Sequence, residues 1–389
     1  MLPFALALTG CDNSTTPPAV QDAATTPADA GSATADAATP ADAGVLDARA
    51  AIDAATVDAG SALDAGVSDA APVDAGAPDA GDEPDAGQPD AGPPPMLQDP
   101  AQDGPFTTAM QQDTYRVPAS NNNLPMNCVY PTSGPGAGPY PAVLIGHGFQ
   151  LPASQYTGYA QRLATFGYVA CTADFRAGFL ANHAENAADM VAGVDWLLQV
   201  DADSTHPLFG LVDDTKIGMM GHSLGGKVSF LAAAQDARIA AVFGLDPVDS
   251  STLCDPTRCP DASDMLPFSI PVGVLGETLD STGSLQNCAP AADNFQTFYS
   301  AANSPALEVD IIGANHMSFI DDPSSCGLPC RACNPATADH ADVLSLARAY
   351  TVAFFERYLR QNMAYDAYLT GAQAQQRYVQ TGLANIQSK

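Results

Sequence analysis

Basic residues are scarce in this sequence of 389 residues. It contains 14 Lys and Arg against 44 Asp and Glu, which gives a formal net charge of −30. A charge of this sign and size repels the phosphates of nucleic acids, so we exclude DNA or RNA as a partner. The charge alone carries no information about the fold.

Aromatic residues are absent between Cys11 and Pro95. That stretch holds 15 Asp, one Glu and a single base, Arg49, and it repeats Asp-Ala-Gly with Pro and Val spacers. Such a composition cannot bury a core, so residues 12–95 are predicted to form a disordered, extended tether. From residue 96 onward the apolar content is ordinary, and residues 96–389 are predicted to fold as one domain.

A short apolar run at the N-terminus ends in Leu8-Thr9-Gly10-Cys11. The run is too short to cross a bilayer as a helix. It resembles the end of a bacterial lipoprotein signal, in which the cysteine is lipidated and becomes the mature N-terminus. The resemblance implies that residues 1–11 are a signal segment and that Cys11 carries a lipid. The protein would then be exported and anchored to the cell envelope, at the outer membrane or the cell surface.

Apolar runs alternate with helical patterns through the predicted domain. Strands are predicted at 113–117, 127–130, 141–145, 168–173, 216–220, 239–245, 271–275 and 307–312. Helices are predicted at 154–166, 184–200, 228–234, 294–302 and 339–361, with a final helical stretch after Gly371. This alternation predicts an α/β fold of the α/β-hydrolase type, with a mostly parallel central sheet and helices on both faces.

One pentapeptide stands where a strand is expected to turn into a helix. It reads Gly221-His222-Ser223-Leu224-Gly225. A G-x-S-x-G sequence in this context is typical of the nucleophile elbow, in which a tight turn exposes the serine hydroxyl. Glycine is needed on both sides because the turn leaves no room for side chains. Ser223 is therefore the candidate nucleophile.

A serine nucleophile needs a base and an acid that orients the base, and in this fold they follow the serine in the order acid, then histidine. His316 follows a predicted strand, whereas His340 opens the last helix, so His316 is the candidate base. Asp246 directly follows the strand 239–245 and is the favoured acid. Asp280, after the next strand, is the alternative, and whichever aspartate is unused is expected to be a solvated loop carboxylate.

The oxyanion formed during acyl transfer needs backbone N–H donors. One is expected from Leu224, the residue after the nucleophile. The second is expected from the loop Gly146-His147-Gly148-Phe149 after the first buried strand, where Phe149 is nominated and Gln150 is the alternative. His147 precedes the nucleophile and is predicted to be structural.

These pieces together resemble the chlorophyllase-like branch of the α/β-hydrolases and, more distantly, bacterial cutinase-like polyester hydrolases. The matching features are the elbow with Lys227, the Asp246-Pro-Val-Asp249 element, Cys288-Ala-Pro with Asn294-Phe295, and residues 313–316. The resemblance covers about residues 113–360 and implies hydrolysis of carboxylic esters. It does not imply chlorophyll as the substrate.

The sequence has nine cysteines, of which Cys11 is assigned to lipidation. Cys254 is expected to pair with Cys259, and Cys128 with Cys171, as suits an exported protein. The connectivity of Cys288, Cys326, Cys330 and Cys333 is left open. The spacing of the last three also fits an iron–sulfur site, but disulfides are favoured.

Two functional hypotheses follow. The first is a serine esterase, which is favoured because nucleophile, acid and base appear in order. It would act on small or polymeric esters as a monomer, without metal or cofactor. Its substrates include polyester, cutin-type or lipid esters. The second is a non-catalytic surface lipoprotein that retains the fold for binding.

Overall fold

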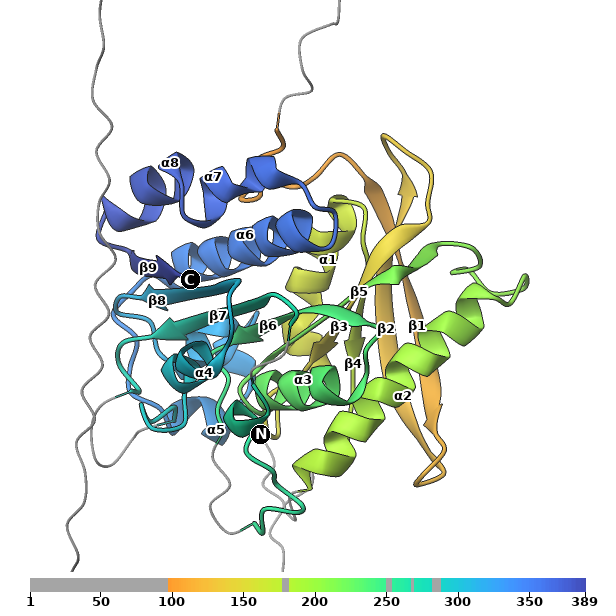
Figure 1. Ribbon diagram of the computed structural model, residues 1–389, viewed down its shortest axis with the longest axis horizontal. Helices are drawn as coiled ribbons and strands as arrows, with labels where there is room; N and C mark the ends of the chain where they lie inside the picture. Colours follow the sequence, from red (N-terminus) through yellow and green to blue (C-terminus); the bar gives the residue numbers. More distant parts are fainter. Residues whose placement is uncertain (1–96, 177–181, 250–253, 267–268, 282–287) are drawn as a thin grey trace, which may run out of the picture. The chain divides into compact units, whose positions relative to one another are not determined.

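The computed structural model describes residues 97–176, 182–249, 254–266, 269–281 and 288–389 (Figure 1). The predicted signal segment with Cys11 and the predicted tether lie outside the described residues. The sequence also predicts that residues 177–183 and 249–267 help to shape the substrate pocket, and parts of both segments lie outside the described residues. No helix in these described ranges is long and apolar enough to cross a membrane.

The described strands form one mixed sheet in the order β1-β2-β4-β3-β5-β6-β7-β8-β9. Strands β3 to β8 are parallel to one another, whereas β1, β2 and β9 join through antiparallel pairs. The strands are β1 (Thr107–Val117), β2 (Asn122–Ser133), β3 (Tyr140–Gly146), β4 (Val169–Ala173), β5 (Val212–His222), β6 (Ile239–Leu245), β7 (Val272–Glu277), β8 (Ala306–Ile311) and β9 (Ala384–Ser388).

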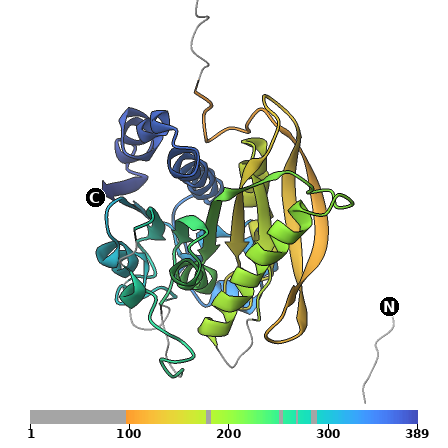
Figure 2. The same ribbon diagram turned by 45° about the vertical axis from the view of Figure 1, so that its right-hand side comes forward.

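Helices cover both faces of this sheet, as the alternation of patterns predicted. They are α1 (Thr157–Thr165), α2 (His183–Asp201), α3 (Leu224–Gln235), α4 (Phe295–Ala301), α5 (Leu328–Arg331), α6 (His340–Tyr358), α7 (Asp366–Leu369) and α8 (Ala372–Ala374). Side chains of α1 and α6 pack in one apolar core, and those of α2, α3 and α4 pack in a second. Figure 2 shows α2 crossing in front of the strands.

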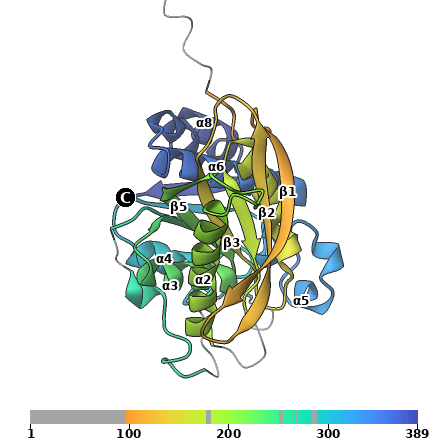
Figure 3. The same ribbon diagram turned by 90° about the vertical axis from the view of Figure 1, so that its right-hand side faces the viewer.

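The central parallel strands are apolar along their whole length because both of their faces are covered. Every residue of β3, β4 and β7 is buried. The outer pair β1 and β2 instead alternates buried with exposed residues over part of its length, and Figure 3 views the sheet from this side. The predicted α/β-hydrolase fold class is confirmed.

The C-terminal stretch differs from its prediction. Residues 372–379 are helical, but the chain then adds β9 as an antiparallel strand beside β8. The sequence Ala-Asn-Ile-Gln-Ser has little apolar character and no strong strand signal. It becomes a strand because the free edge of β8 offers unpaired backbone groups, which is a tertiary and not a local cause.

Candidate active site

Ser223 lies in the sharp turn between β5 and α3. Its backbone has φ 55° and ψ −122°, a left-handed conformation that is strained for a residue with a side chain. A Cβ on Gly221 would lie 2.3 Å from the Gly225 carbonyl oxygen, and a Cβ on Gly225 would lie 2.4 Å from that of Gly146. Both flanking glycines are therefore required by backbone contacts, and the turn has the geometry expected of a nucleophile elbow.

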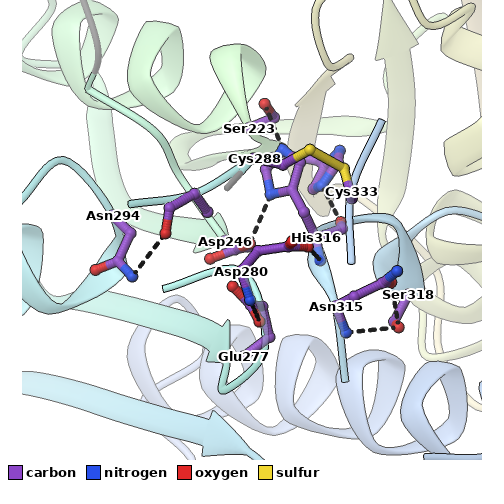
Figure 4. A network of polar contacts seen from close by, with 12 residues as sticks. Ser223, Asp246, Glu277, Asp280, Cys288, Asn294, Asn315, His316, Ser318 and Cys333 are labelled. Atoms are coloured by element: carbon purple, nitrogen blue, oxygen red, sulfur yellow. Dashed lines mark hydrogen bonds and ion pairs between the residues drawn. A yellow bond between two sulfur atoms is a disulfide. The ribbon is translucent and has the colours of Figure 1, made fainter. Parts of the chain in front are cut away.

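Three side chains from three loops form a chain of hydrogen bonds at this turn (Figure 4). The Nε2 atom of His316 is 2.8 Å from the Ser223 hydroxyl oxygen, and its Nδ1 atom is 2.6 Å from Oδ2 of Asp246. Ser223 follows β5, Asp246 follows β6, and His316 lies just beyond β8 in the 3-10 helix η3 (His316–Phe319). The structure thus brings together the nucleophile, the favoured acid and the base predicted from the sequence.

The directions of these two hydrogen bonds follow from the carboxylate. An ionised Asp246 can only accept, so Nδ1 of His316 carries the proton that it shares with Asp246. Nε2 is then left as the acceptor for the Ser223 hydroxyl. Asp246 and His316 are both buried, at 0% and 3% exposure. Burial raises the pKa of Asp246, and the hydrogen bond with His316 opposes that rise.

Asp280 was expected to be a solvated loop carboxylate if Asp246 served as the acid, and this expectation is wrong. Asp280 is fully buried. Its Oδ2 accepts from the backbone N–H of His316 at 2.9 Å, and its Oδ1 accepts from that of Asn334 at 2.8 Å. The carboxylate is retained inside because it satisfies two backbone donors, and it fixes the loop that carries the candidate base.

Glu277 is a buried carboxyl near Asp246 whose burial the sequence did not predict. It ends β7, and Oε2 accepts from the backbone N–H groups of Leu279 and Asp280 at 2.5 and 2.6 Å. Burial, with the nearby Asp246 charge, raises the pKa of Glu277 to about 9, so it is protonated at neutral pH. Its Oε1 atom and Oδ1 of Asp246 have no hydrogen-bond partner within the described ranges.

The loop after β3 packs against the elbow, as an oxyanion loop should. Gly146 is in register with Gly221 of β5, and a Cβ on Gly225 would lie 2.6 Å from the carbonyl oxygen of His147. Phe149 is 43% exposed, and Gln150 has φ 56°. His147 is buried and stacked on Phe175 with ring centroids 4.1 Å apart, which agrees with the structural role predicted for it.

The side chains of Lys227 and Asp249 form a buried ion pair. The ammonium of Lys227 lies 2.9 Å from Oδ1 of Asp249 and donates to the Asp249 backbone carbonyl. Val248 also donates its N–H to the Ser223 carbonyl. These contacts connect the loop that carries Asp246 to the helix that follows Ser223, so they fix the candidate acid relative to the candidate nucleophile.

Disulfides join the eight cysteines of the described domain. The predicted pairs Cys128–Cys171 and Cys254–Cys259 are confirmed, and the open connectivity resolves as Cys288–Cys333 and Cys326–Cys330. Asp280, Cys288 and Cys333 place potential metal ligands within 4.8 Å of one another. Because the two sulfurs are joined, neither is a thiolate, and the group fits a disulfide packed beside Asp280 and not a metal site.

Comparison with known proteins identifies the family. A family model described as Chlorophyllase matches residues 102–381. The chain belongs to the chlorophyllase family. The resemblance to the chlorophyllase-like branch, read from the elbow, Lys227 and the Asp246-Pro-Val-Asp249 element, is thereby confirmed.

Relatives of two kinds support this placement. Chlorophyllase-1, chloroplastic, of Citrus sinensis is 28% identical over 196 residues, which cover 49% of this chain and 58% of that protein. Chlorophyllase-1 of Arabidopsis thaliana is 25% identical over 228 residues, 56% of this chain and 69% of that protein. Bis(hydroxyethyl) terephthalate hydrolase of Streptomyces coelicolor is 24% identical over 233 residues, with coverages of 57% and 67%. The chain spans less than two thirds of the length of the Citrus chlorophyllase.

Proposed function

We propose that this chlorophyllase-family protein is a serine hydrolase that cleaves carboxylic esters. The observation that carries the proposal is the hydrogen-bonded chain from Ser223 through His316 to Asp246, formed at the carboxyl ends of parallel strands, where ligands bind in open α/β sheets. Names of relatives that denote ester hydrolases support the same reaction class.

In the proposed acylation step, the Ser223 oxygen attacks the ester carbonyl carbon and transfers its proton to Nε2 of His316. Asp246 holds Nδ1–H of the imidazole and stabilises the imidazolium that forms. The tetrahedral intermediate then collapses as His316 gives the proton to the leaving alcohol. An acyl group remains on Ser223, and the alcohol departs.

The negative charge on the carbonyl oxygen needs donors that are fixed in advance. We assign them to the backbone N–H groups of Leu224 and Phe149. Leu224 is the first residue of α3, where helix N–H groups have no partner within the helix and the helix dipole favours an anion. Phe149 belongs to the loop that packs against the elbow, and Gln150 remains the alternative donor.

Deacylation reverses these roles. Water gives a proton to Nε2 of His316 and attacks the acyl carbonyl, the same donors hold the oxyanion, and Ser223 leaves with the proton returned to it. The products are a carboxylic acid and an alcohol. No step requires a metal or a cofactor.

For the substrate, we propose esters of the kinds that the relatives' names denote, with polyester, cutin-type and lipid esters as the classes to compare. Chlorophyll is not specifically favoured. A panel of p-nitrophenyl esters of increasing acyl length, together with bis(hydroxyethyl) terephthalate and a polyester film, would rank these classes by kcat/KM.

We also propose that Cys11 is lipidated and anchors the domain to the cell envelope through the acidic tether. The support is the Leu8-Thr9-Gly10-Cys11 sequence and the use of disulfides, which form in oxidising compartments. In a bacterial host, Cys11→Ser is expected to move the protein from the membrane fraction to the soluble fraction, as followed by detergent partition and by mass spectrometry of the N-terminus. An unchanged partition would contradict the anchor.

Replacing the nucleophile tests the enzymatic proposal. Ser223→Ala is expected to lower kcat on p-nitrophenyl acetate by at least about 10⁴-fold, since no other group can form the acyl-enzyme. A fluorophosphonate probe should label the folded wild type and not this variant. The matched control is Ser229→Ala, because the Ser229 hydroxyl is buried in α3 and donates to the Gly225 carbonyl. Failure of the probe to label the wild type would instead favour a non-catalytic binding protein.

A further inference from the structure

We propose that Tyr156 and His222 are positioning residues that link the oxyanion loop to the loop of the catalytic base. The proposal rests on the ester hydrolase function above. It adds a hydrogen-bonded contact that fixes the position of the oxyanion loop relative to the loop of the base. Tyr156 ends the 3-10 helix η1 (Ala153–Tyr156), and His222 is the residue before the nucleophile. Neither residue belongs to the catalytic chain of Ser223, His316 and Asp246.

Hydrogen bonds connect the two loops in one unbroken path. The backbone N–H of Gly148 donates to the Tyr156 hydroxyl at 3.1 Å. That hydroxyl is 2.8 Å from Nδ1 of His222, and Nε2 of His222 is 2.8 Å from the backbone carbonyl oxygen of His316. Gly148 precedes the proposed oxyanion donor Phe149, so the path begins beside one catalytic group and ends on another.

The direction of every bond in this path is fixed by chemistry. A backbone carbonyl can only accept, so Nε2 of His222 must carry a proton. In a neutral imidazole Nδ1 is then the acceptor, and the Tyr156 hydroxyl must donate to it. The same hydroxyl accepts from Gly148 with a lone pair. Removing any one member therefore leaves a buried donor or acceptor without its partner.

Burial keeps His222 in the neutral form that this path requires. His222 and Tyr156 are both 0% exposed, and burial lowers the pKa of His222 well below its ordinary value. The charged and titratable groups that face it are His316, with ring centroids 4.6 Å apart, and the Tyr156 hydroxyl. An imidazolium forming on His316 during catalysis adds a further reason for His222 to remain neutral.

The backbone of the base is held from both sides. Asp280 accepts from the His316 N–H, and His222 donates to the His316 carbonyl. These two contacts fix the peptide units on either side of the imidazole, so its position relative to Ser223 does not depend on the side-chain bond to Asp246 alone. The second contact passes through His222, which is next to Ser223 in sequence and moves with it.

Gly148 is required by the same arrangement. A Cβ at this position would lie 3.1 Å from Nδ1 of His222, 3.1 Å from the Tyr156 hydroxyl and 2.9 Å from Leu151. A side chain there would press on both members of the path. The second glycine of the Gly146-His147-Gly148 sequence is thus explained by the link.

The test compares two tyrosines that each lose one buried hydroxyl. Tyr156→Phe is expected to lower kcat by ~10- to 100-fold with KM changed less than about threefold, since small displacements of catalytic groups cost this much. Tyr350→Phe is the matched control, because the buried Tyr350 hydroxyl donates to the Leu369 carbonyl away from the site. Both variants should lose similar thermal stability, and only Tyr156→Phe should lose kcat.

Variants of His222 separate the two ends of the path. His222→Gln places an amide near Nε2 and keeps a donor for the His316 carbonyl, so it is expected to retain at least about tenfold more kcat than His222→Phe. In the double variant with Tyr156→Phe and His222→Phe, the losses should not multiply, since residues in one network couple. A kcat for Tyr156→Phe within twofold of wild type, or fully multiplicative losses, would overturn the link. Fluorophosphonate labelling of wild type alone reports on the proposed function, independently of these ratios.

Discussion

Three residues of the candidate site have a strained backbone. Among the described residues, those other than glycine with a left-handed φ include Ser223 at 55°, Asp246 at 41° and Gln150 at 56°. Ser223 and Asp246 directly follow β5 and β6, and Gln150 lies in the loop after β3. Conformations of this kind persist only where the surroundings enforce them, and here they aim the nucleophile and the acid at one imidazole.

The two aspartates beside His316 have different tasks, and matched substitutions should separate them. Asp246→Asn is expected to lower kcat by about 10³- to 10⁴-fold, because an amide that donates to Nδ1 places the imidazole proton on Nε2, where it blocks transfer from Ser223. Asp280→Asn should cost only about tenfold, because its remaining oxygen still accepts from one backbone N–H. Steady-state kinetics on p-nitrophenyl acetate would measure both, and a larger loss for Asp280→Asn would assign the acid to Asp280.

Glu277 should make stability depend on pH. Its pKa is about 9 when folded and 4.5 ordinarily, so above pH 4.5 the unfolded chain releases a proton that the folded protein keeps. Its contribution to stability is therefore complete below pH 4.5 and is lost as pH rises to about 9. In the wild type this loss amounts to at most about 1.4 kcal/mol of unfolding free energy per pH unit. Glu277→Gln has no such loss, because its amide does not titrate.

The measurement is the urea midpoint of wild type and Glu277→Gln at pH 5, 7 and 9. With each rise in pH, the urea midpoint of the variant is expected to increase relative to that of the wild type. Its kcat at pH 7 should stay close to that of the wild type, because an amide resembles the protonated carboxyl. A constant difference between the two proteins across this range would show that Glu277 is ionised when folded.

Some residues of the site were predictable because their signal is local. Ser223 is marked by its glycines, and His316 and Asp246 are marked by their places after apolar runs. The burial of Asp280 and Glu277 has no such signal, since each is an acid in a loop or at a strand end like many others in this chain. Only the packing of the loops after β7 and β8 places their carboxyls against backbone N–H groups.

At the scale of elements, backbone atoms of β3, β5 and α3 are in close contact at the elbow. Gly225 lies where the first turn of α3 crosses the end of β3, so Gly225→Ala is expected to disrupt both. A Cβ 2.4 Å from a backbone oxygen cannot be relieved by a side-chain rotation. We expect a loss of a few kcal/mol, at the upper end of single substitutions, with activity lost in the folded fraction.

The control for this substitution is Gly193→Ala in α2. There the added Cβ meets the ends of flexible side chains, Leu144 at 3.1 Å and Met126 at 3.2 Å. Alanine also has a helix propensity about 1 kcal/mol better than glycine. Thermal melts should show Gly193→Ala near neutral and Gly225→Ala strongly destabilised, and equal effects would contradict the role of the backbone contact.

The central strands were predictable because each is a clear apolar run, whereas the outer strands were predicted too short or not at all. The strand at 239–245 was predicted with its observed bounds, because a buried parallel strand is a continuous apolar run between breaks. The outer strands β1 and β2 extend well beyond their predicted lengths, since half of an exposed strand is polar. The last strand, β9, depends entirely on the edge of β8 and so had no local signal.

At the scale of the whole molecule, the disulfides Cys128–Cys171 and Cys288–Cys333 join segments that are distant in the sequence. Four cysteines left open in the sequence allow three pairings, and spacing alone does not choose among them. The fold determines the pairing, because it brings the loops after β7 and β8 together at the carboxyl edge of the sheet. Cys288 and Cys333 come from these two loops and pair beside Asp280.

Two of these disulfides form a natural comparison of stability with function. Cys288–Cys333 and Cys128–Cys171 close loops of similar length, with separations of 45 and 43 residues. Chain entropy therefore predicts a similar loss of about 4 kcal/mol when either is replaced by a pair of alanines. Cys254–Cys259, with a separation of 5, should cost only about 2 kcal/mol.

Activity should distinguish the two long-range disulfides. Cys128–Cys171 joins β2 to β4 within the sheet, whereas Cys288–Cys333 lies against the carboxylate that holds the His316 backbone. Removing the latter pair should lower kcat at 20 °C by about tenfold in protein that is still folded by circular dichroism, and removing the former should leave kcat unchanged. Equal kcat values in the two variants would mean that Asp280 fixes the loop of His316 without the help of the disulfide. Cys288–Cys333 would then contribute to stability alone.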